Sequence, residues 1–93
     1  MSKPGFVYIL SNKYRTTLYM GVTSNLERRL AEHRTSTADT FTNRYNLHDL
    51  LYFEHFMDIK DAIDRETTIK KWNRSKKDAL IATKNPTLSS LEI

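Results

Sequence analysis

A carboxylate occupies a position in this 93-residue chain where helical periodicity favours an apolar side chain. Apolar residues recur at the spacing of one helical face in residues 58–72: Ile59, Ala62, Ile63 and Ile69. Glu66 falls on the same face. An ionised carboxylate withdrawn from water costs free energy unless it is paired or binds a cation. Glu66 therefore either pairs with Lys70, one turn later, or binds a metal ion.

A guanidinium and an imidazole share a helical face in residues 25–33. Leu26 and Leu30 mark the apolar side of this segment. Arg29 lies four residues before His33, so the two side chains are neighbours on a helix. Because arginine offers a planar fork of donors that matches phosphate oxygens, the pair suits an anionic ligand. The alternative is an arginine whose stem covers Leu26 while its head reaches solvent.

Two tyrosines, Tyr8 and Tyr19, lie in strand-like runs on either side of a polar turn. With the turn centred near residues 13 and 14, the two rings face each other across a hairpin. Cross-strand aromatic pairs commonly stabilise sheets, so a structural role is one interpretation. Gly21 favours a site, because glycine within a strand often marks the close approach of a backbone or a ligand.

Taken together, these groups occur in an order that resembles the GIY-YIG nuclease domain and, more narrowly, its small single-domain bacterial members. The similarity covers about residues 5–86. It rests on these segments and their joint spacing: Val7-Tyr8-Ile9, Tyr19-Met20-Gly21-Val22-Thr23, Leu26-Glu27-Arg28-Arg29-Leu30 with Glu32-His33, Arg65-Glu66 and Lys70-Lys71-Trp72. The resemblance implies one GIY-YIG-like nuclease domain over residues 1–86, followed by a C-terminal tail, residues 87–93.

The apolar positions of both family triplets differ in this chain. They read Phe6-Val7-Tyr8 and Tyr19-Met20-Gly21. Both tyrosines and the second glycine remain, so the implied chemistry is preserved. Several family members carry an asparagine near the C-terminal end of the domain, and Asn85 is the candidate here. Asn73, which is nearer to Glu66 in sequence, is the alternative.

The resemblance implies a divalent-metal-dependent endonuclease that hydrolyses phosphodiester bonds in DNA, with structure-selective or weakly sequence-specific recognition. Mg²⁺ or Mn²⁺ would be the cofactor, with Glu66 as its main protein ligand. Arg29 would hold the phosphate and Tyr19 would position water or phosphate. Tyr8 would help to remove a proton from the attacking water, and His33 would steady this network. An unperturbed phenol is a poor base at neutral pH, so we expect a nearby cation to favour the ionised form of Tyr8.

Basic residues flank these positions and favour a polyanionic partner, most simply DNA. The chain carries a net charge of +4, concentrated in residues 28–34 and 70–77. A solvated basic face that only keeps the domain soluble is the alternative. The residues assigned to nucleic-acid binding are Gly21, Arg28, Arg34, Lys70, Lys71, Arg74 and Asn85.

Two other functions remain open on the sequence. One is a non-catalytic nucleic-acid-binding module of the same fold that acts with a partner protein. The other is an interaction domain in which Arg29 and Glu66 pair inside the core. Because 93 residues form one domain without a second DNA-binding module, an enzyme of this size is expected to recognise nucleic-acid shape or to need a protein partner for targeting. DNA repair or recombination is the expected setting.

From its composition we expect the protein to be cytoplasmic. The chain has no cysteine, which excludes disulfides and thiolate metal sites. No apolar run approaches a membrane span or the core of a signal peptide, so we expect no membrane partner. The histidines are scattered without metal-ligand spacing, and no glycine-rich phosphate loop is present.

The elements that must position these groups form a small α/β domain. Apolar runs on either side of the polar residues 12–17 predict an N-terminal β-hairpin over about residues 6–23. A third strand, residues 49–56, carries consecutive apolar side chains, as a strand buried on both faces does. We therefore expect a three-stranded sheet, with the third strand in its centre, flanked by helices.

Capping patterns predict where the helices begin. Ser24 followed by Glu27 is a capping box for a helix over residues 25–33. Asp58 caps the next helix, and Trp72 near its end is expected to pack on the core, with base stacking as the alternative.

A short final helix is expected to open with Ser75 and Asp78 and to end before Asn85-Pro86. Residues 87–93 show no periodic pattern and are expected to be disordered. Residues 34–46 are expected to form a polar loop in which Phe41, Arg44 and Tyr45 stack on or clamp exposed bases. The alternative is that Phe41 and Tyr45 pin the loop to the core.

Overall fold

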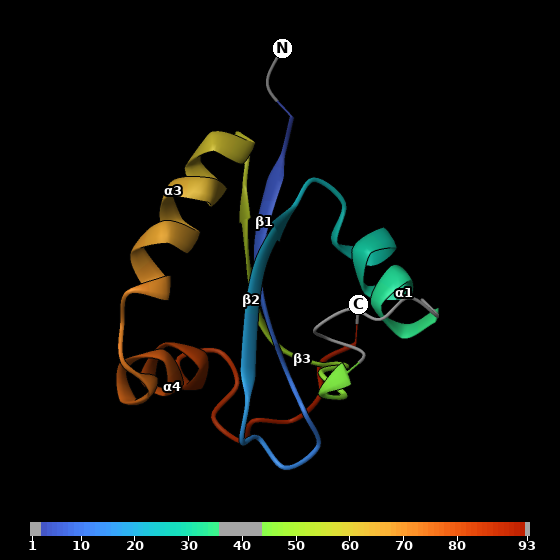
Figure 1. Cartoon of the computed structure of the whole chain (residues 1–93). Helices are drawn as coiled ribbons and strands as arrows, with labels where there is room; N and C mark the ends of the chain where they lie inside the picture. Colours follow the sequence, from blue (N-terminus) through green and yellow to red (C-terminus); the bar gives the residue numbers. More distant parts are fainter. Residues whose placement is uncertain (1–2, 36–43, 93) are drawn as a thin grey trace.

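The protein folds as a three-stranded antiparallel sheet with helices on both faces (Figure 1). The structure is a computed structural model and describes residues 3–35 and 44–92. The elements are β1 Gly5–Ser11, β2 Leu18–Thr23, α1 Leu26–Thr35, β3 Asp49–Phe56, α3 Ile59–Lys70 and α4 Arg74–Ala82. Helix α1 covers one face of the sheet, and α3 and α4 cover the other. This arrangement confirms the predicted α/β fold.

Strand β3 has the bounds expected from the sequence but lies at an edge, because the strand order is β2-β1-β3. The prediction of a central β3 was therefore wrong. Its consecutive apolar residues serve both faces, since Leu51 packs on the α3 side and Leu50 on the α1 side. The C-terminal segment covers its outer edge: the Leu91 amide donates to Leu50 O at 2.7 Å, and Asn85 Nδ2 donates to Leu51 O at 2.9 Å.

The hairpin register differs from the predicted one. Tyr8 pairs with Gly21, and Leu10 pairs with Tyr19, so the two tyrosines are diagonal neighbours on one face rather than direct partners. The turn is therefore centred one residue later than expected, between residues 14 and 15. The side chain of Asn12 sets this turn by accepting hydrogen bonds from the amides of residues 16 and 17, each at 3.0 Å.

Alternation along β1 supplies two apolar cores, one on each face of the sheet. Val7 and Ile9 pack toward α3 and α4, with Ala62, Ile69 and Ile81. The opposite core packs toward α1 and contains Tyr8, Leu10, Leu26, Leu30, Leu47 and Leu50. Because β1 is buried on both faces, it is the strand that fixes the two helical layers relative to each other.

Two of the three predicted helix caps were wrong. Asn25 rather than Ser24 caps α1, since the amide of residue 28 donates to Asn25 Oδ1 at 3.0 Å. Asn73 rather than Ser75 caps α4 from an extended backbone, and its Oδ1 accepts from the amide of residue 76 at 2.8 Å. Asp58 caps α3 as predicted. In the two wrong cases an asparagine lies within two residues of the predicted serine, and both residue types are good caps.

The C-terminal segment, expected to be disordered, has a defined path over residues 87–92. Leu88 and Leu91 are half-buried and pack against the two cores. Arg15 Nε also donates to Leu88 O at 2.9 Å. Short apolar anchors without helical or strand periodicity hold this segment, so a periodicity search misses it.

Trp72 is partly buried and packs against the core, as predicted. Most of the predicted loop over residues 34–46, with Phe41, lies outside the described residues. Arg44 and Tyr45 are exposed. No helix in residues 3–35 or 44–92 has both the length and the apolar character needed to cross a bilayer.

Candidate active site

Three aromatic rings meet between the sheet and α1. The ring centroids of Tyr8 and Tyr19 lie 6.4 Å apart, and His33 lies 6.0 Å from each of them. Strands β1 and β2 carry the two tyrosines. Helix α1 carries His33, which lies on the face that the sequence predicted to be apolar. The structure therefore brings together three residues that the sequence separates by up to 25 positions.

The Tyr8 hydroxyl lies at the centre of this cluster. It is 3.2 Å from His33 Nε2, and Arg29 Nε donates a hydrogen bond to its oxygen at 3.4 Å. Because the guanidinium has no acceptor, the tyrosine oxygen accepts from it, which leaves the hydroxyl proton for the imidazole nitrogen. The sequence prediction that Arg29 and His33 share a face is confirmed by these contacts.

Gly21 is required by this packing. A Cβ atom at this position would lie 2.6 Å from the Tyr8 hydroxyl oxygen and 2.7 Å from its Cζ. Such distances force the ring to move, so only glycine lets Tyr8 lie flat across β2. Gly21 therefore acts by leaving room for the Tyr8 ring. This contact is the close approach that a glycine within a strand predicted.

The pKa shifts of the buried pair favour neutral groups. Burial raises the pKa of Tyr8, and the hydrogen bond from Arg29 opposes this rise without reversing it. Our expectation that a nearby cation favours the ionised phenol is therefore wrong for the protein alone. Burial, reinforced by the positive charge of Arg29, lowers the pKa of His33. At neutral pH His33 is then a neutral imidazole that can accept the Tyr8 proton.

Arg29 adopts neither of the simple arrangements considered from the sequence. Its side chain is 42% exposed, and its head bonds both the Tyr8 hydroxyl and Glu32, with Nη1 3.1 Å from Glu32 Oε2. The bond to Tyr8 is the main cause of the raised pKa of Arg29, which stays a cation. One edge of the guanidinium is thus fixed while the side chain stays accessible from solvent.

Glu66 belongs to the other side of the sheet, on α3. Its side chain is 19% exposed and pairs with Lys70 at 3.2 Å between Oε1 and Nζ. Since Arg29 pairs with Glu32, the interpretation in which Arg29 and Glu66 pair inside the core was wrong. The apolar stripe is also narrower than predicted, because Ile63 is 49% exposed while Ala62 and Ile69 are buried.

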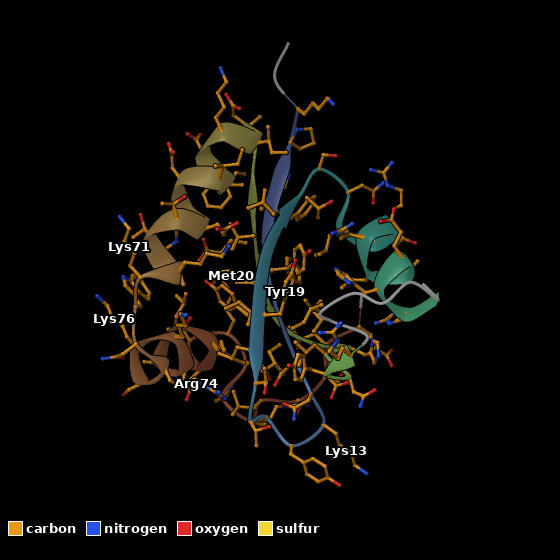
Figure 2. All side chains as sticks on the ribbon, viewed as in Figure 1. Lys13, Tyr19, Met20, Lys71, Arg74 and Lys76 are labelled. Carbon is orange, nitrogen blue, oxygen red and sulfur yellow. The ribbon has the colours of Figure 1, made fainter. Side chains whose placement is uncertain are left out.

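The edge strand β2 connects the two halves of the site. Figure 2 shows Tyr19 and Met20 on opposite sides of this strand, with Met20 directed toward α3 and α4. A cavity of about 360 Å³ lies beside it and is lined by Ile9, Leu18, Tyr19, Met20, Lys70 and Lys77. Its lining thus includes a member of the aromatic cluster and the ion-pair partner of Glu66.

The donor chemistry of Glu66 fits a hard divalent cation. Mg²⁺ binds one or two carboxylates, and waters and substrate phosphate oxygens complete its coordination. Glu66 is accessible to solvent, and its partner Lys70 is 57% exposed on a flexible stem that can turn aside. In the described parts of the chain, no three histidine, cysteine, aspartate or glutamate side chains converge on one point.

The basic residues assigned to nucleic-acid binding differ in how far other contacts hold them. Arg28, Arg34 and Lys71 are exposed, although Arg28 lies 3.6 Å from Glu32. Arg74 instead fastens α4 to the hairpin turn, because its guanidinium donates to Thr16 O at 3.3 Å and to the carbonyl of residue 15.

Both candidate asparagines have structural contacts. Asn85 is 4% exposed, and its Nδ2 donates to Leu51 O and Ser89 O at 2.9 and 2.8 Å. Its Oδ1 accepts from the Ser89 amide at 3.2 Å. Asn73 caps α4. These contacts tie the C-terminal segment to β3 and explain why Asn85 is buried; they give no support to its assignment as a nucleic-acid contact.

Sequence reasoning missed an ionic network beside Glu66. Arg65 Nε and Nη2 donate to Glu54 Oε1 and Oε2 at 3.0 and 3.1 Å, and the Tyr52 hydroxyl also donates to Glu54. Burial alone would raise the pKa of Glu54, but hydrogen bonds from Arg65 and Tyr52 hold it below its ordinary value. The signal available in the sequence was Glu54, a carboxylate directly after the four consecutive residues Leu50, Leu51, Tyr52 and Phe53.

Comparisons with known proteins match this chain over most of its length. Residues 4–79 match the family model of the GIY-YIG catalytic domain. A UPF0213 protein of Natronomonas pharaonis is 38% identical over 82 residues, which cover 88% of this chain and 95% of the relative. A UPF0213 protein of Clostridium perfringens is 39% identical over 80 residues, which cover 86% and 85%.

A solved structure shares the fold. The solution NMR structure of a UPF0213 protein from Bacillus halodurans matches with a TM-score of 0.59 and 26% sequence identity, over 90% of this chain and 88% of the other. The names of these three relatives state no activity and no ligand.

Proposed function

Because this chain belongs to the GIY-YIG catalytic domain family, and thus to a nuclease superfamily that acts on nucleic acid, we propose that it is a divalent-metal-dependent endonuclease. The proposed reaction is hydrolysis of phosphodiester bonds in DNA. One observation carries the proposal: the Tyr8 hydroxyl lies between a neutral imidazole and a guanidinium, 3.2 Å from His33 Nε2 and 3.4 Å from Arg29 Nε.

The proton path follows from these contacts. As Tyr8 takes a proton from the attacking water, its own proton passes to His33 Nε2, so a full phenolate need not form beforehand. The raised pKa of Tyr8 and the lowered pKa of His33 set the starting state of this path, a neutral phenol beside a neutral imidazole, and both shifts make the transfer itself more costly. Arg29 then bonds both the tyrosine oxygen and a phosphate oxygen as negative charge develops.

Glu66 would hold the divalent ion, Mg²⁺ or Mn²⁺, after Lys70 turns aside. When bound, the ion supplies stabilisation of the charge on the leaving oxygen. Lys70, released from Glu66, remains at the cavity beside β2 and can contact a neighbouring phosphate. Tyr19 is also a lining residue of this cavity, and its phenol would orient water or phosphate.

The proposal extends to the setting of the reaction. We propose a cytoplasmic enzyme whose domain recognises DNA structure, shows weak sequence preference or acts with a protein partner, in repair or recombination. The exposed Arg28, Arg34 and Lys71 would supply sequence-independent phosphate contacts.

A non-catalytic nucleic-acid-binding module is the second candidate. The ion pair between Glu66 and Lys70 favours it, because this pair already neutralises the one carboxylate assigned to the metal. Such a module would bind DNA or RNA with the same basic residues and would need no divalent ion.

Cleavage of a labelled panel tests the two candidates: duplex, single-stranded, flap and branched DNA, and RNA, each with Mg²⁺ or Mn²⁺. We expect metal-dependent cutting that Glu66→Gln lowers at least about 100-fold, because the lost carboxylate charge would hold the ion that stabilises the transition state. Binding should change little. Asp64→Asn removes an exposed carboxylate from the same helix and should cut normally. Equal cutting by Glu66→Gln would refute the metal site, and metal-independent binding without cutting would favour the module.

A further inference from the structure

The cavity beside β2 combines an apolar floor with a cationic rim. Ile9, Leu18 and Met20 supply the apolar lining, and Lys70 and Lys77 bring ammonium groups from α3 and α4. Its volume of about 360 Å³ is within the range of small-ligand sites, roughly 300–1,000 Å³. A site of this size and character fits a flat, weakly polar group joined to an anion.

The strand beside this cavity also offers polar backbone groups. Among the described strands, β2 pairs only with β1, so its outer edge retains amide and carbonyl groups that no neighbouring strand takes. Such groups can bond the edge of a heterocycle whose faces lie against apolar side chains. A nucleobase has both features, and the phosphates on either side of it match the two lysines.

Charge outside the cavity points to a strand rather than to a small molecule. Lys71 and Lys76 extend the positive surface away from the two lysines of the rim, over the outer side of α3 and α4 (Figure 2). Consecutive phosphates of one strand would follow such a surface. A single mononucleotide would use only the rim.

We propose that this cavity binds one unpaired nucleotide of the substrate strand, with the base on the apolar floor and its phosphates on Lys70 and Lys77. The inference rests on the proposed function and specifies its substrate class: strands that carry a bulged, flapped or branch-point nucleotide. A base inside a regular duplex would first have to leave the stack, which disfavours it. The seated nucleotide would lie beside both Tyr19 and the partner of Glu66.

Binding in metal-free buffer with EDTA tests this inference without any need for cutting. The probes are two otherwise identical DNA duplexes, one with a single bulged 2-aminopurine and one with that base paired. We expect the wild-type protein to bind the bulged duplex about tenfold more tightly and to change the 2-aminopurine emission on binding.

Matched lysine variants separate the cavity from general charge. Lys77 lines the cavity, whereas Lys76 lies over the Trp72 ring at 4.3 Å and does not. Lys77→Ala should lower the preference for the bulge severalfold, and Lys76→Ala should weaken both duplexes equally, since each removes one charge. Leu18→Trp should abolish the preference by filling the cavity, with circular dichroism to confirm folding.

Three outcomes would overturn the proposal. Equal binding of the two duplexes by the wild type is one, and an unchanged preference in both Lys77→Ala and a folded Leu18→Trp is another. The third is displacement of the bulged duplex by free nucleoside monophosphate at a concentration equal to that of the bulged site, which would identify a mononucleotide pocket instead. Cutting with Mg²⁺ despite a failed bulge preference would refute only the pocket, and a bulge preference without cutting would refute only the nuclease.

Discussion

At the scale of single residues, the Tyr8 hydroxyl determines what the site can do. It is buried, so its exchange of protons with bulk water is restricted, and the two side chains of α1 that contact it differ in kind. Arg29 can only donate, while a neutral His33 can accept. A proton that enters from one side of Tyr8 therefore has an acceptor on the other side, which a lone tyrosine would lack.

Replacing Tyr8 by Phe should stop this transfer while the ring still fills the core. We expect the rate of phosphodiester cleavage to fall at least about 100-fold, the usual size of a lost acid–base contribution. The free energy of unfolding should fall by about 1–3 kcal/mol, because buried partners lose a hydrogen bond. Single-turnover cleavage and thermal melting measure the two effects. Tyr14→Phe, at a 77% exposed position, should match the wild type in both, and cutting by Tyr8→Phe at the wild-type rate would disprove the assigned proton path.

A Cβ at Gly21 should act through the same hydroxyl. Gly21→Ala forces the Tyr8 ring away from β2, and we expect a loss of about 1–3 kcal/mol in stability together with loss of cleavage. Denaturant unfolding in two backgrounds is the check. In Tyr8→Ala protein the clashing ring is gone, so adding Gly21→Ala should cost almost nothing. An equal cost in both backgrounds would mean that strand propensity, not the ring contact, explains the glycine.

At the scale of elements, the rotation of α3 decides which way Glu66 faces. Arg65, the preceding residue, holds both oxygens of Glu54 on β3 with its Nε and Nη2. This two-point contact fixes the helix about its axis, because a guanidinium fork and a carboxylate match in only a narrow range of orientations. Glu66 and Lys70 consequently face the β2 side of the sheet, where the cavity lies.

Replacing Glu54 by Gln should loosen that contact and change the acid stability of the protein. The folded pKa of Glu54 lies below its ordinary value of 4.5, so its stabilisation is full above that value and is lost as the pH falls through the folded pKa. Melting temperatures from about pH 6 to about pH 3 should therefore fall less steeply in Glu54→Gln than in the wild type.

The same variant should cleave DNA about threefold to tenfold more slowly at neutral pH, since a small misplacement of a catalytic group costs rate. Glu27→Gln, which changes an exposed carboxylate on α1, is the control and should follow the wild type in melting. Parallel acid melting curves for Glu54→Gln and wild type would contradict the stabilising contact between Glu54 and Arg65.

At the scale of the whole molecule, the C-terminal segment closes the outer edge of β3, at the opposite side of the sheet from β2. Asn85 and Leu91 bond β3 carbonyls, and Arg15 joins this segment to the hairpin turn and to β3 through Leu88 O and Asp49. An exposed edge strand is a site of association between chains, so covering it keeps β3 from pairing with another molecule. The β2 edge stays open on the side of the cavity.

Asn85→Ala should therefore weaken the fold more than the site. Loss of three hydrogen bonds at a buried position should lower the free energy of unfolding by about 2–4 kcal/mol, measured by urea titration. Nucleic-acid binding well below the melting temperature should be unchanged. Thr87→Ala, at a neighbouring exposed residue, is the control. A binding defect in folded Asn85→Ala, without loss of stability, would instead support a direct role in nucleic-acid binding.

Local spacing was sufficient to determine several features from the sequence. The bounds of β3, the cap at Asp58, the shared face of Arg29 and His33 and the tight approach at Gly21 all follow from periodicity, capping or side-chain size. The joint order of motifs also predicted the family, and residues 4–79 match it.

Only the tertiary structure decided the features that depend on contacts between distant segments. Strand order and hairpin register depend on which strand edges pair in the folded chain. In the structure β3 is an edge strand and Tyr8 pairs with Gly21, and the sequence predicted neither. The raised pKa of Tyr8 depends on how deeply the folded layers bury it, which local sequence does not fix. The bond between Arg65 and Glu54 joins two elements whose relative placement no local pattern predicts, although Glu54 stands out in its strand.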